Sequence, residues 1–206
     1  MMKRRDLLRY GAELAGVTAV GVGAVESGVL AGAETPLVHP PGASTEDEFL
    51  GNCIKCGRCI QACPPNALGF AELRDGLLRS GSPKLTPAAG GCIAWGEHCL
   101  ECIDACPTDS LHPVETDDAG IPTDEVIGRA QIDDDRCINC ANCYPICPVE
   151  AVIQHDKEAG RETFSIDVEE CVGCGRCIEI CPVDGTAIEL FPPDSSPAYP
   201  IDMEGL

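Results

Sequence analysis

Sixteen cysteines, arranged as four repeats of one spacing, constrain this 206-residue chain more than any other feature. Three groups follow the pattern C-x2-C-x2-C-x3-C and are followed by a proline. The second group along the chain keeps the last two intervals and the proline, but places six residues between its first two cysteines. The groups are Cys53, Cys56, Cys59 and Cys63; Cys92, Cys99, Cys102 and Cys106; Cys137, Cys140, Cys143 and Cys147; and Cys171, Cys174, Cys177 and Cys181. Every cysteine of the chain therefore belongs to a set of four.

The two-residue gaps curl the backbone into a tight loop, so that three thiolates face one centre while the fourth cysteine points toward a second centre. This is the spacing with which bacterial ferredoxins bind cubane [4Fe–4S] clusters. The proline ends the short helical turn of the fourth cysteine, because it has no backbone N–H and a fixed φ. Gly57 and Gly175 follow second cysteines and allow unusual φ values there. We predict four [4Fe–4S] clusters, with all sixteen cysteines as metal ligands.

Disulfides and zinc are the alternative uses of so many cysteines. An even number of cysteines in an exported chain is compatible with a disulfide framework, but disulfides do not require cysteines at i, i+3 and i+6 before a proline. Zinc sites use separated C-x2-C pairs rather than triplets. In the stretched second group, His98 is an alternative ligand to Cys92. We expect Cys92 to ligate, with residues 93–98 forming a loop that bulges outward.

Short, partly apolar stretches follow the four groups at residues 67–70, 110–112, 151–153 and 187–190, and they are typical of β-strands. Residues 153–166 have the pattern of a strand, a Gly-containing turn and a strand. The expected fold class is α+β, with two bacterial-ferredoxin-like modules of two clusters each.

Which groups share a module stays open. The hairpin-sized spacer between the third and fourth groups favours sequential pairing, first with second and third with fourth. Nested pairing joins the first with the fourth and the second with the third. It is favoured by the near-identity of residues 56–59 and 174–177.

The first 33 residues have the order of an export signal: a basic start with Arg4 and Arg5, an uncharged apolar run at 14–25, and small residues at 31–33. The arginine pair indicates the twin-arginine route. The apolar run is shorter than the 18–20 residues of a membrane-spanning helix, so we expect no transmembrane span after processing. We further expect a linker at 34–50, the four-cluster region at 51–190 and a flexible tail at 191–206.

The charge balance excludes some classes of partner. The chain has 14 basic and 34 acidic residues, a net charge of -20, which argues against binding to nucleic acid or anionic membrane surfaces. Low lysine with abundant acids resembles proteins from high-salt cells, and we hypothesise that the protein is halophilic. The four histidines are scattered, and no nucleophile arrangement or Gly-rich phosphate loop occurs. We therefore predict an electron-transfer protein or subunit without a catalytic site of its own.

With its arginine pair and four cysteine groups, the sequence resembles the exported four-cluster ferredoxin-type proteins of periplasmic nitrate reductase and methylamine-utilisation systems. The resemblance covers about residues 1–10 and 51–190. It implies a periplasmic or extracytoplasmic protein that relays electrons between a membrane quinol-oxidising partner and an exported reductase or oxidoreductase. Two alternatives stay open, namely an electron-transfer subunit of a molybdenum-type oxidoreductase and a maturation factor for an exported metalloenzyme.

Overall fold

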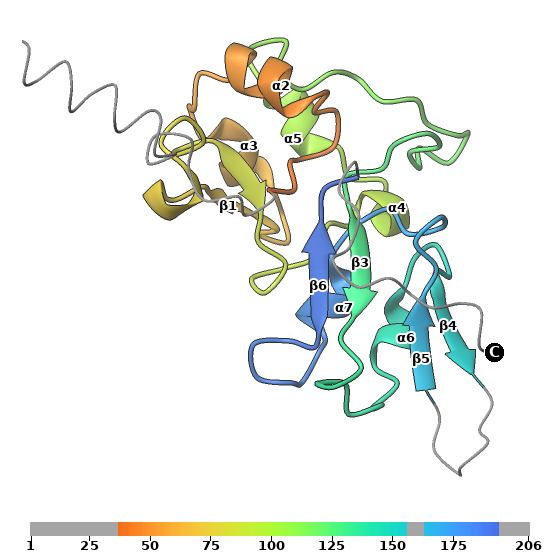
Figure 1. Ribbon diagram of the computed structural model, residues 1–206. Helices are drawn as coiled ribbons and strands as arrows, with labels where there is room; N and C mark the ends of the chain where they lie inside the picture. Colours follow the sequence, from red (N-terminus) through yellow and green to blue (C-terminus); the bar gives the residue numbers. More distant parts are fainter. Residues whose placement is uncertain (1–36, 156–162, 194–206) are drawn as a thin grey trace, which may run out of the picture. The chain divides into compact units, whose positions relative to one another are not determined.

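The computed structural model describes residues 37–155 and 163–193, drawn in colour in Figure 1. The helices are α2 (Glu46–Asn52), α3 (Arg58–Ala62), α4 (Ala94–Glu97), α5 (Glu101–Asp104), α6 (Cys143–Ile146), α7 (Arg176–Glu179) and the 3-10 helix η1 (Leu73–Asp75). The strands are β1 (Leu68–Phe70), β2 (Pro83–Leu85), β3 (Arg129–Ile132), β4 (Val152–His155), β5 (Thr163–Ile166) and β6 (Ile188–Phe191). These short helices and strands together give the mixed α and β content that the sequence predicts.

The chain divides into two compact units, and every cysteine lies in the larger one, which comprises Pro36–Ala71 and Gly81–Leu206. The described part of the smaller unit is Glu72–Ser80. Within it, η1 begins with a capping box, in which the Glu72 backbone N–H donates to the Asp75 carboxylate at 2.6 Å. The side chain of Glu72 also pairs with Arg74 on the surface.

Three antiparallel strand pairs make up the described β structure (Figure 1). β1 pairs with β2, β4 with β5 and β3 with β6. The register places Leu68 opposite Leu85 and Val152 opposite Ile166, so each pair buries apolar side chains. The third pair joins two segments far apart in sequence, because β3 precedes the third cysteine group and β6 follows the fourth.

Most of the expected strands are confirmed. β1 and β6 follow the first and fourth cysteine groups, and β4 and β5 form the hairpin expected at 153–166, with residues 156–162 lying outside the described part. The strand expected at 110–112 is wrong, because this segment forms a bend. The His112 N–H donates to the Gly42 carbonyl at 2.8 Å, but Pro113 follows and has no N–H with which to continue a strand ladder.

Apolar residues of the segment 37–50 belong to the core, in contrast to the linker expected at 34–50. Leu37 and Val38 are buried, and Phe49 of α2 is fully buried with its ring centroid 4.5 Å from that of His39. The Leu85 N–H donates to the Val38 carbonyl at 2.7 Å, which ties this segment to β2. The predicted signal at 1–33 lies outside the described residues, as does the part of the tail beyond 193.

Two apolar cores lie beside the cysteines. The first packs around Phe49 and Trp95, and the second around Phe164 and Ile166. Cysteine side chains belong to both cores, including the buried Cys102 and Cys171. Short helices pack in pairs, α3 with α5 beside the first core and α6 with α7 beside the second. Within residues 37–155 and 163–193, no helix is long and apolar enough to cross a membrane.

Candidate metal centres

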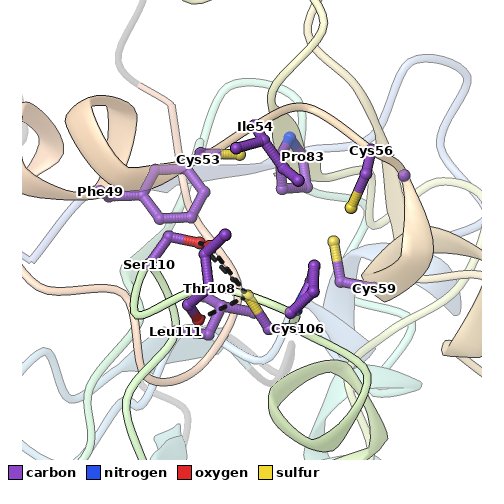
Figure 2. Close-up of a pocket in the computed structure, with 12 residues that line it drawn as sticks. Phe49, Cys53, Ile54, Cys56, Cys59, Pro83, Cys106, Thr108, Ser110 and Leu111 are labelled. Atoms are coloured by element: carbon purple, nitrogen blue, oxygen red, sulfur yellow. Dashed lines mark hydrogen bonds between the residues drawn. The ribbon is translucent and has the colours of Figure 1, made fainter.

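Four cysteines from two groups surround one pocket, here called the Cys53 pocket. Cys53, Cys56 and Cys59 of the first group line it together with Cys106, the last cysteine of the second group. Figure 2 shows the four sulfur atoms around a common space, with Phe49 and Leu111 among the apolar residues of the wall. The first group thus supplies three thiols and the second group supplies the fourth.

Three further pockets repeat this arrangement and are named by their first cysteine. The Cys63 pocket is lined by Cys63, Cys92, Cys99 and Cys102; the Cys137 pocket by Cys137, Cys140, Cys143 and Cys181; and the Cys147 pocket by Cys147, Cys171, Cys174 and Cys177. Each cysteine lines one of the four pockets. The fourth cysteines are exchanged between the first and second groups and between the third and fourth. The structure therefore places the groups in sequential pairs, which the sequence left open.

The arrangement of four thiols around each pocket suits a cluster better than a single ion. In the part of the chain that the structure describes, no three His, Cys, Asp or Glu side chains are close enough to hold one metal ion. Tetrahedral zinc needs its ligands within about 2.3 Å of one centre, whereas a cubane takes one cysteine at each of four separate irons. All sixteen cysteines are described, and all are free thiols.

Backbone conformation brings the thiols of each group to its pocket. Gly57 and Gly175 are the N-caps of α3 and α7, with φ of 71° and 76°. The unusual φ values predicted at these glycines are therefore confirmed, and they lie in the left-handed region. Lys55, Asn139 and Ala141 also have positive φ, between 54° and 64°, a region that costs non-glycine residues roughly 1–2 kcal/mol. The turn geometry is thus kept even where the sequence has no glycine.

The electrostatics of the pockets favour a cationic occupant. Burial, together with repulsion from Cys53, Cys106 and Cys56, raises the pKa of Cys59 to about 11. In the Cys137 pocket, burial and repulsion from the other three cysteines of that pocket together raise the pKa of Cys143 to about 11. Four thiolates cannot gather in such a site without compensating positive charge. Iron ions supply that charge, so the residues fit an iron–sulfur cluster.

Cys106 and Cys181 differ from the other cysteines with shifted pKa values because hydroxyl groups, in addition to backbone groups, face their sulfur atoms. Burial raises the pKa of Cys106, but the hydroxyl of Ser110, 3.3 Å from its sulfur, and contacts with Thr108 lower the pKa below its ordinary value. The dashed lines in Figure 2 mark these contacts. At Cys181, burial likewise raises the pKa, and backbone amides with the Thr186 hydroxyl give a net lowering.

Sequence reasoning missed these hydroxyl groups. The available signal was a serine or threonine two to five residues after the last cysteine of the second and fourth groups, at Thr108, Ser110 and Thr186. These are the groups whose last cysteine enters the pocket of the preceding group.

The stretched second group keeps its first cysteine at the pocket. Cys92 lines the Cys63 pocket, and burial raises its pKa to about 12. The six residues between Cys92 and Cys99 include the helical turn α4, in which Ala94 and Trp95 are buried, so this part of the loop packs inward where an outward bulge was expected. His98 follows this turn with a φ of 58°; it is exposed and is not among the residues that line the pocket.

Family models match the region of the four cysteine groups. A model described as a 4Fe-4S dicluster domain matches residues 130–190, which include the third and fourth groups. A second model with the same description matches residues 52–110 and 92–151. The first of these matches includes the first and second groups, and the other overlaps it to include the second and third. The chain therefore contains ferredoxin-type iron–sulfur domains.

Curated relatives align in sequence with most of the chain. The methylamine utilization ferredoxin-type protein MauM of Methylorubrum extorquens is 32% identical over 152 residues, which are 71% of this chain and 67% of the relative. MauM of Paracoccus denitrificans is 30% identical, covering 71% of this chain and 66% of the relative. The ferredoxin-type protein NapG of Escherichia coli is 33% identical over 153 residues, 70% of this chain and 61% of the relative. The chain thus spans about two thirds or less of these relatives.

Proposed function

The chain belongs to the family of ferredoxin-type iron–sulfur proteins that includes MauM and NapG, and on this premise we propose that it relays electrons between a membrane quinol-oxidising partner and an exported redox enzyme. The observation that supports this role best is the presence of four similar cysteine-lined pockets within one compact unit. One isolated pocket would suffice for a structural cluster. Four pockets in one small unit suit a chain that passes electrons between two partners.

We propose that the four cysteines of each pocket ligate one [4Fe–4S] cluster, so that the protein holds four clusters. Such clusters supply a reversible one-electron couple whose potential depends on net charge, hydrogen bonding to sulfur and solvent exposure. The protein supplies those surroundings: Phe49 and Leu111 wall one pocket from water, and hydroxyl groups face the sulfur of Cys106.

Iron content and redox titration test the cofactor assignment. We expect about sixteen irons and as many acid-labile sulfides per chain in protein purified without oxygen. Low-temperature EPR during a redox titration should show cubane signals. Zinc in place of iron, or disulfides detected by mass with no iron, would contradict the assignment.

A rapid-mixing experiment tests the relay. Protein reduced by membranes that hold a quinol pool should transfer its electrons to a candidate exported reductase in a single turnover. If the protein is not oxidised but is still required for the reductase to acquire its metal centre, it is a maturation factor. Stable co-purification with a large cofactor-containing chain would identify it as a subunit of a molybdenum-type oxidoreductase.

Export by the twin-arginine route is part of the proposal, because clusters assembled in the cytoplasm must cross the membrane in a folded protein. Replacing Arg4 and Arg5 with lysine should keep the iron-loaded protein inside the cell. Fractionation of cells that express the two forms, followed by detection of the protein in the periplasmic fraction, measures this. Equal export of both forms would contradict this route.

A further inference from the structure

The two modules meet directly at the Cys63 and Cys147 pockets. The Cys92 N–H, beside the Cys63 pocket, donates to the carbonyl of Cys174, beside the Cys147 pocket, at 2.7 Å. The neighbouring Gly91 N–H donates to the carboxylate of Glu179 at 2.9 Å. These two bonds join residues more than 80 positions apart and link the second cysteine group to the fourth.

Close backbone packing surrounds these two hydrogen bonds. A Cβ on Gly91 would lie 2.7 Å from the Arg176 Cα, so only glycine fits there without a shift of the backbone. On the other side, a Cβ on Gly175 would lie 2.7 Å from the Pro87 Cβ. We call this contact, formed by Gly91 and Cys92 against residues 174–179, the module junction.

Within each module, the exchanged cysteines set which pockets are neighbours. The Cys53 pocket adjoins the Cys63 pocket, because Cys59 and Cys63 lie on the same turn of chain, as do Cys102 and Cys106. By the same geometry, the third and fourth groups make the Cys137 and Cys147 pockets neighbours. Together with the module junction, these contacts order the four pockets in one series. It begins at the Cys53 pocket, continues through the Cys63 pocket and the Cys147 pocket, and ends at the Cys137 pocket.

Solvent exposure distinguishes the ends of this series from its middle. Cys56 and Cys140 are the exposed cysteines of the chain, and they line the two end pockets. Ile54 and Ile138 stand beside them with 63% and 62% of their surface exposed. The cysteines of the two middle pockets are buried or partly buried.

We propose that the module junction positions the Cys63 and Cys147 pockets for electron exchange between the two modules. The proposal rests on the proposed function, since it assigns an order to pockets that hold clusters. It makes Gly91 a positioning residue, because no larger side chain fits against Arg176.

The test is Gly91→Ala in the full-length holoprotein. Gly51→Ala is the matched control, because a Cβ on Gly51 would meet no atom within 4 Å. The measurements are iron per chain, hydrogen exchange of the peptide that contains Cys92, and EPR of the fully reduced protein, in which neighbouring clusters broaden and split each other's signals. We expect Gly51→Ala to match the wild type. Gly91→Ala should keep its iron, exchange faster at Cys92 and lose the part of the splitting that arises between modules.

An unchanged EPR spectrum in an iron-loaded Gly91→Ala protein with faster exchange would overturn the proposal, since the junction would be open without effect on the clusters. If Gly91→Ala loses iron, the same measurements on Glu179→Ala test the proposal in its place. This variant removes one hydrogen bond of the junction without adding atoms. Failure to exchange electrons with a quinol-oxidising partner would contradict the proposed function but leave these spectra unaltered, so the two failures are distinguishable.

Discussion

At the scale of single residues, the hydroxyl of Ser110 bears most directly on redox chemistry. Ser110 is 3% exposed, and its oxygen lies 3.3 Å from the Cys106 sulfur. A hydrogen bond to a thiolate stabilises the reduced, more negative form of the cluster. Ser110→Ala should therefore lower the reduction potential of the Cys53-pocket cluster. A bond of about 1 kcal/mol corresponds to roughly 40 mV for a one-electron couple.

An EPR-monitored redox titration measures this shift. Ser44→Ala is the control, because Ser44 is exposed and does not line a cysteine pocket. A potential that does not move in Ser110→Ala, with the cluster retained, would show that this hydroxyl does not tune it.

The sequence alone singled out all sixteen cysteines that line the pockets. It did not indicate which cysteine groups exchange their fourth cysteines. Cysteine spacing is a local property, and it indicates which three thiols of a group share a centre. The transfer of Cys106 to the Cys53 pocket depends on how α3 packs against α5, which lie 40 residues apart in sequence. Ser110 was missed for a local reason, because cysteine spacing does not reveal the turn after Pro107 that brings its hydroxyl back to Cys106.

At the scale of elements, the cysteine loops use left-handed backbone at equivalent positions with different residues. Gly175 has a φ of 76°, and its counterpart Ala141 in the third group has a φ of 64°. Gly175→Ala should destabilise the holoprotein by about 2 kcal/mol, from the left-handed conformation and from contact with Pro87. Ala141→Gly should be neutral or stabilise by about 0.5 kcal/mol, because relief of strain exceeds the added chain entropy.

Chemical unfolding followed by the visible absorption of the clusters compares these two variants. Equal midpoints for Gly175→Ala and the wild type would contradict the role assigned to this glycine.

The elements also show where local patterns lose their predictive power. β1 and the β4–β5 hairpin were predictable because apolar residues and turn residues alternate along contiguous sequence. Helix α2 was missed because its segment is rich in acids and follows a stretch of proline and serine, although Phe49 at its centre is fully buried. Its burial depends on contacts with distant residues, which composition does not reveal.

At the scale of the whole molecule, the clusters should hold the fold together. Cysteines belong to both apolar cores, and a site that forms only with metal contributes its binding free energy to folding. Removing iron with a chelator should unfold the protein and expose Trp95, the single tryptophan, which is 3% exposed in the fold. Tryptophan fluorescence should shift to longer wavelength, and iron with sulfide should restore it. An iron-free protein with unshifted emission would contradict this expectation.

The net charge of -20 leads to a prediction about salt. Among the described acidic residues Asp75 is buried, and the others are exposed or partly exposed. Repulsion among exposed carboxylates opposes compact folding, and dissolved ions screen it over about 3 Å at molar salt. The free energy of unfolding should rise between dilute buffer and molar potassium chloride. Denaturant titrations at the two salt concentrations measure it, and equal stability would refute the halophilic hypothesis.

Cys56 and Cys140 are exposed, whereas the cysteines of the two middle pockets are buried or partly buried, and this difference also determines how oxygen damages the protein. Oxidants reach thiolates and irons in proportion to their accessibility, so damage should begin at both ends of the series and advance inward. A partly degraded sample would then keep its two middle centres and lose the two at the exposed ends. Such a protein would keep its colour and its fold, but it could no longer exchange electrons with its partners.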